Sequence, residues 1–151
     1  MMNAISGKIE TVLQTLWIGG LWVVGYVVTP ILFASLVDER RLAGELAGHM
    51  FTAINYIGLA CGTLLLAFAV LKLNGSFLKD RRIMVLLLML VLIVVSAFVL
   101  QPMMQELKLN GIVPGSEAAA QFGQLHGVSS VLYLLTSLLG LFVLLSRRQT
   151  A

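Results

Sequence analysis

Two histidines and a few uncharged polar residues, set at the ends of long apolar runs, are the side chains of this sequence that could do chemistry. Imidazole rings transfer protons and ligate metals, whereas amides and hydroxyls form directional hydrogen bonds to a ligand. A helix break at a proline adds a backbone carbonyl that has lost its usual donor. The candidate pocket residues are Pro30, Asn55, Gln101, His126, Ser129 and Ser130.

The same residues offer little for catalysis. No carboxylate lies inside an apolar run, the lone cysteine Cys61 lies among leucines, and no phosphate-binding glycine loop is present. The sequence leaves enzymatic activity uncertain and favours a protein that is not an enzyme. We expect no metal and no cofactor. The alternative is a haem or transition-metal site in which His49 and His126 bind from facing helices.

Four apolar runs must position these side chains. The chain is 59% hydrophobic and 11% charged, against ~25% charged in soluble domains, and every charged residue falls outside the runs. A helix of ~20 apolar residues spans the ~30 Å hydrocarbon layer of a bilayer, so a soluble fold is excluded. The predicted spans cover residues 12–36, 46–71, 83–100 and 122–145.

The spans predict an all-α membrane protein: one domain over residues 1–151, folded as an antiparallel four-helix transmembrane bundle. An even number of spans places both termini on one side, and that side carries seven of the ten basic residues. These seven are Lys8, Lys72, Lys79, Arg81, Arg82, Arg147 and Arg148, against Arg40, Arg41 and Lys108 opposite. The positive-inside rule therefore predicts cytoplasmic termini in a multi-pass protein of the bacterial inner membrane. No basic stripe lies on a polar scaffold, so nucleic acid is not an expected partner.

This topology brings the candidate pocket residues to one depth, near the outer ends of the spans. Polar side chains at membrane depth are costly unless they face the bundle interior, so the sequence predicts an outer polar pocket. His126 is its expected centre, whereas His49 is expected in the solvated interface. As alternatives, His126 ties a carbonyl near Pro30, and Asn55 and Gln101 bond helix to helix.

Paired glycines indicate where helices approach closely, because small residues let backbones meet where lipid gives no hydrophobic drive. Trp17 and Trp22 are expected to pack on such a glycine-rich face. The packing serves either a single bundle or the seam of a homo-oligomer, and both interpretations stay open. The pairs are Gly44 with Gly48, Gly58 with Gly62, and Gly123 with Gly127.

Local signals add three boundaries to this pattern. A kink is expected near Pro30, the third span is expected to end at Gln101 and Pro102, and Ser116 is a suitable cap for the helix that leads into the fourth span.

Several of these residues together resemble a known family. The Leu-His-Gly-x-Ser-Ser string from Leu125 is its most specific part, and the resemblance extends over all four spans. The other residues that carry it are Trp17, Gly19, Gly20, Trp22, Pro30, Phe33, Ala43, Gly44, Phe51, Gln101, Pro102 and Phe122. They are similar to the small bacterial members of domain-of-unknown-function family 4149, whose eukaryotic relatives are called transmembrane protein 205.

The resemblance implies an integral membrane protein with no assigned reaction. Gln101 stands where the eukaryotic relatives carry an acidic residue, and a neutral amide argues against a proton- or cation-linked role. The expected function is to bind or pass a small molecule or lipid in the outer pocket, or to support a membrane partner. The lipid bilayer itself is the one partner that the composition requires.

Cysteine labelling tests the orientation. In a variant whose Cys61 is replaced, cysteines placed within 38–41 and 110–116 should react with an impermeant reagent from outside, whereas cysteines within 74–79 should be protected. The opposite labelling pattern would place the pocket on the cytoplasmic side.

Overall fold

The computed structural model describes residues 2–73 and 80–146, which form four helical rods joined by short turns. Each rod contains a segment long and apolar enough to cross a membrane. The first rod is α1 (Met2–Val23), the π-helical turn η1 (Val24–Val28) and α2 (Thr29–Ser35); the second is α3 (Arg40–Leu73). The third is α4 (Arg81–Val95), the π-helical turn η3 (Ser96–Leu100) and α5 (Gln101–Leu109); the fourth is α6 (Glu117–Leu145). The predicted all-α fold with four membrane-crossing helices is confirmed.

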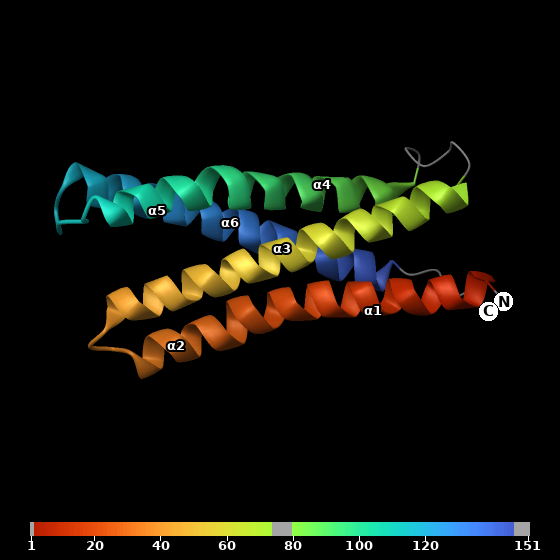
Figure 1. Cartoon of the computed structure of the whole chain (residues 1–151), viewed down its shortest axis with the longest axis horizontal. Helices are drawn as coiled ribbons and strands as arrows, with labels where there is room; N and C mark the ends of the chain where they lie inside the picture. The colour runs from red at the N-terminus through yellow and green to blue at the C-terminus, as the bar shows by residue number, and fades with distance from the viewer. Residues whose placement is uncertain (1, 74–79, 147–151) are drawn as a thin grey trace.

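The rods run antiparallel and form a ring in which α1 and α4 each pack against both α3 and α6 (Figure 1). The beginning of α1 and the end of α6 lie at the same end of the bundle. The opposite end, formed by α2, α5 and the beginnings of α3 and α6, is called the α2–α5 end below. Residues 74–79, which include Lys79, and the basic pair Arg147 and Arg148 were used to predict the orientation and lie outside the described residues.

The half of the bundle away from the α2–α5 end is closely packed around one indole. Trp17 is fully buried and its ring lies against Gly58 and Gly62 of α3. A Cβ at Gly58 would come within 2.5 Å of the Trp17 Nε1, and one at Gly62 within 3.0 Å of the same ring. These two glycines therefore let α1 and α3 approach closely, whereas the other tryptophan, Trp22, is 37% exposed.

A π-helical turn precedes each of the two prolines within the rods. In η1 the Val24 carbonyl accepts both the backbone N–H and the hydroxyl of Thr29, the latter at 2.8 Å, just before Pro30. In η3 the backbone N–H of Gln101 bonds to the carbonyl of Ser96, just before Pro102. A wider turn absorbs the clash and the missing donor that proline brings to a helix.

The third rod consequently continues past Pro102, as α5, where the sequence predicted that it ends. Its last turn leads into a loop with Gly111 and Gly115 at φ +82°, a conformation that glycine adopts without strain. Ser116 then caps α6 by accepting a hydrogen bond from the Ala119 N–H at 3.2 Å, as expected from its sequence.

Beyond the π-helical turns the bundle divides into two helix pairs. α2 packs on α3, and α5 packs on α6. The two pairs spread apart toward the α2–α5 end (Figure 1), so the helices that meet around Trp17 do not meet there.

The glycine contacts of Trp17 predict a position-specific loss of stability. Gly58→Ala should lower the free energy of unfolding by about 1–3 kcal/mol, because the rigid indole leaves no room for the methyl group. The measurement is thermal unfolding in a mild detergent. Gly123→Ala on α6 is the control, since a Cβ there meets nothing within 4 Å. Equal stability of the two variants would contradict the prediction.

Candidate functional site

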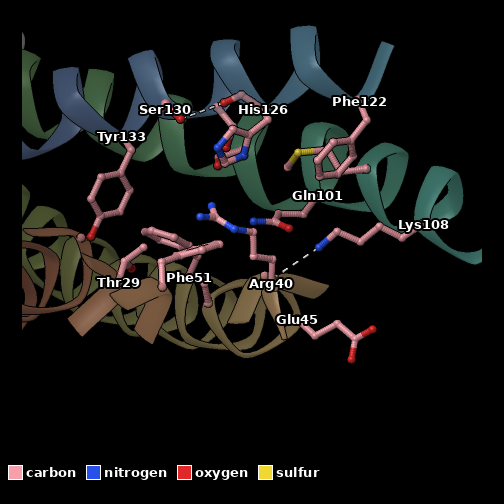
Figure 2. A pocket seen from close by; sticks show the side chains of 18 of the residues that line it. Thr29, Arg40, Glu45, Phe51, Gln101, Lys108, Phe122, His126, Ser130 and Tyr133 are labelled. Carbon is pink, nitrogen blue, oxygen red and sulfur yellow. Dashed lines mark hydrogen bonds between the residues drawn. The ribbon is translucent and has the colours of Figure 1, made fainter. Parts of the chain in front are cut away.

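A cavity of about 960 Å³ fills the space between the two helix pairs. Its lining comes from all four rods, including both π-helical turns. Figure 2 shows side chains from both pairs pointing into this space. The volume lies at the upper end of the ~300–1,000 Å³ typical of small-molecule sites, so the cavity is large enough for a drug-sized or lipid-like molecule.

Two tyrosine hydroxyls close the floor of the cavity by tying the first rod to α6. Tyr133 donates to the carbonyl of Leu21 at 2.6 Å, and the hydroxyls of Tyr26 and Ser137 lie 2.7 Å apart. The Tyr133 ring lies so close to Gly25 that any Cβ there would collide with it. These contacts hold the helices together directly below the point where they diverge.

Asn55 is the most buried polar side chain of the lining. It is 4% exposed, and neither it nor half-buried Gln101 forms a side-chain hydrogen bond within the described part of the chain. Asn55 lies roughly 22 Å along α3 from Arg40 at ~1.5 Å per residue, so the cavity reaches deep into the bundle. The helix-to-helix hydrogen bonds expected for these two amides are therefore absent from the described residues, and the amides are available to a ligand.

Aromatic rings form the walls. Phe51 meets Tyr133 edge to face, with the ring centroids 4.9 Å apart. Phe122 stacks on the imidazole of His126 at 6.1 Å between centroids and an interplanar angle of 11°. Buried Met104 also lines the space. The walls thus present apolar surface beside the free amides.

Three cationic side chains, Arg40, Arg41 and Lys108, line the cavity at the α2–α5 end, and this part is called the mouth below. Arg41 pairs with Glu45 at 3.7 Å, whereas Arg40 points toward His126 and Gln101 (Figure 2). Lys108 extends from α5 to the opposite helix pair, where its Nζ donates to the Gly44 carbonyl at 3.4 Å; the same Nζ lies 5.6 Å from the centroid of Phe122. The mouth is therefore bridged by one long cationic side chain.

Five of the six candidate pocket residues line the cavity. They are Asn55, Gln101, His126, Ser129 and Ser130. The sixth, Pro30, is not in the lining, where its neighbour Thr29 takes part instead. His49 is exposed on α3 and also lies outside the lining, so the structure does not place both histidines in this site.

Several lining residues were missed by the sequence reasoning. Arg40, Arg41 and Lys108 were counted only as topology signals, although all the basic residues on their side of the chain gather at the mouth. That concentration of cations was a usable signal. Tyr26 and Phe51 gave none, because aromatic residues in an apolar run fit packing and lining equally well.

The remaining glycine pairs have no close helix contact. Gly44 and Gly48 line the cavity, and a Cβ at Gly48 would meet only the Lys108 Nζ, at 4.0 Å. A Cβ at Gly123 or Gly127 would meet nothing within 4 Å. A homo-oligomer seam at these positions stays a prediction.

The lining is better equipped to bind than to react. Its one carboxylate, Glu45, is paired with Arg41. The Ser130 hydroxyl donates to the backbone carbonyl of His126 at 2.9 Å, and within the described residues no hydrogen bond joins a hydroxyl to the imidazole. Residues 2–73 and 80–146 hold no group of three or more His, Cys, Asp and Glu side chains able to bind a metal.

The fold and the cavity define a multi-pass integral membrane protein with an internal site open toward one end of the bundle. The family model described as "Domain of unknown function (DUF4149)" matches residues 12–113, and the chain belongs to this family. No curated protein and no solved structure matches the chain.

The two histidines should respond differently to truncation. His126→Ala should weaken ligand retention by the purified protein and change the unfolding temperature little, because the exposed ring forms no hydrogen bond in the described structure. His49→Ala, at a likewise exposed position on α3 but outside the cavity lining, should change neither the ligand retention nor the unfolding temperature. Mass spectrometry of retained molecules and thermal unfolding measure the two effects. Equal ligand retention by both variants would remove His126 from the site.

Proposed function

We propose that this membrane protein binds a small molecule or lipid in the cavity at the α2–α5 end and holds it or passes it through the outer half of the bilayer. The observation that carries the proposal is Asn55. Its amide lies deep in the cavity lining and forms no side-chain hydrogen bond within the described part of the chain, so it is placed to bond to a molecule that enters the cavity.

The combination of polar and aromatic lining also supports a ligand of mixed character. Free amides at Asn55 and Gln101 suit a hydrogen-bonding group, whereas Phe51, Phe122 and Met104 suit an apolar one. Binding pockets for small molecules commonly pair apolar walls with a few placed polar groups.

The distribution of basic residues supports the bacterial inner membrane as the location, with the α2–α5 end toward the periplasm. Seven basic residues lie on the side of the termini and three on the side of the cavity. In this orientation the cavity receives its ligand from the outer leaflet or from the periplasm.

Binding is better supported than the haem or metal alternative. His126 lines the cavity and His49 does not, so a site built on both rings gains no support from their positions.

Filling the cavity tests the proposal. Ser129→Trp places an indole in the lining, and Val131→Trp places the same group two residues away at a side chain that is 55% exposed and outside the lining. The proteins are extracted into nanodiscs with native lipid, and retained small molecules and lipids are measured by mass spectrometry. We expect the wild type and Val131→Trp to retain a molecule that Ser129→Trp loses. Identical retained molecules in all three proteins would contradict the proposal.

A further inference from the structure

At the α2–α5 end, basic side chains lie in the cavity lining, whereas most acidic side chains lie outside it. All three basic residues there, Arg40, Arg41 and Lys108, line the cavity. Of the five acidic residues at that end, only Glu45 does. The other four are Asp38, Glu39, Glu106 and Glu117. The outer surface therefore has an excess of acid, whereas the cavity mouth has an excess of positive charge.

Two of the three cations have no anionic partner. Arg41 has an acidic neighbour in Glu45, at 3.7 Å in an exposed pair, but neither Arg40 nor Lys108 forms an ion pair within the described part of the chain. The contacts of Lys108 are with a neutral carbonyl at 3.4 Å, longer than the usual 2.7–3.2 Å, and with the face of Phe122. Both cations are therefore free to bind an anion.

Two of the cations lie at the amino end of a helix. Arg40 and Arg41 occupy the first turn of α3, directly after Asp38 and Glu39. Arg40 also directs its guanidinium toward Gln101 and His126, into the cavity, while the Glu45 carboxylate points away (Figure 2).

Apolar surface lies immediately below the cations. Phe122 is in contact with Lys108 and stacks on His126, and Phe51 lies deeper, against Tyr133. A molecule whose charged group reaches Arg40 and Lys108 thus has aromatic walls beside the rest of its length.

We propose that the ligand is an anionic amphiphile, with a phosphate or carboxylate head between Arg40 and Lys108 and an apolar part against Phe122 and Phe51. This inference rests on the proposed function and narrows it to one ligand class. Charge complementarity disfavours a cationic head, and the aromatic walls disfavour a small inorganic anion.

Matched probes test the ligand class. Dodecyl phosphate and dodecylphosphocholine share one chain but differ in net head charge, and inorganic phosphate has the head without the chain. Binding to the full-length protein in an uncharged detergent is measured by calorimetry. We expect dodecyl phosphate to bind at least tenfold more tightly than dodecylphosphocholine, and inorganic phosphate to bind weakest.

Variants test the site. Arg40→Gln and Lys108→Gln should each weaken dodecyl phosphate binding about tenfold and leave dodecylphosphocholine binding unchanged. Arg40→Lys should recover part of the loss. Arg81→Gln, an exposed residue at the opposite end, is the control for net charge. Thermal unfolding verifies that each variant is folded.

The outcomes separate this inference from the proposed function. Equal binding of the two amphiphiles, or no binding of either, would overturn the anionic amphiphile. The proposed function would still stand if the wild type and Val131→Trp retain a molecule that Ser129→Trp loses. A loss of dodecyl phosphate binding in Arg81→Gln equal to that in Arg40→Gln would overturn the assignment of the site. Inorganic phosphate that binds as tightly as dodecyl phosphate would overturn the amphiphilic character of the ligand. In nanodiscs, displacement of dodecyl phosphate by phosphatidylglycerol supports a bilayer lipid as the source, and its absence supports a free amphiphile.

Discussion

The contact of Trp17 with the bare backbone of Gly58 and Gly62 is the interaction on which the rest of the bundle depends. Helices in lipid gain little from hydrophobic burial, so they associate through close packing. A buried indole against two glycines gives α1 and α3 that packing, and Met89 and Val143 complete a core from the other two rods. Since one half of the bundle is fixed in this way, the other half can remain open.

The boundary between the two halves is set by proline chemistry and two hydroxyl ties. Pro30 and Pro102 follow π-helical turns on diagonally opposite rods, and the helices diverge beyond them. Directly below, Tyr133 bonds to the Leu21 carbonyl over Gly25, where no side chain fits. The backbone irregularities therefore create the opening, and the tyrosine limits its depth.

The open half places polar side chains along a cavity that all four rods line. Asn55 and Gln101 face the cavity without partners, and Lys108 reaches across the mouth to a neutral carbonyl. The proposed ligand would supply hydrogen bonds to the two amides and an opposite charge to Lys108.

The sequence by itself determined the four spans, the irregularity at Pro30 and the Ser116 cap, because these follow from run length and local backbone chemistry. Only the tertiary structure decided how each helix is rotated about its axis. Lipid and bundle core are both apolar, so periodicity does not reveal which face turns inward, and a shift of one residue exchanged Pro30 for Thr29 in the lining. The same reason explains why Gly58 and Gly62 meet Trp17 while Gly123 and Gly127, equally spaced, meet nothing.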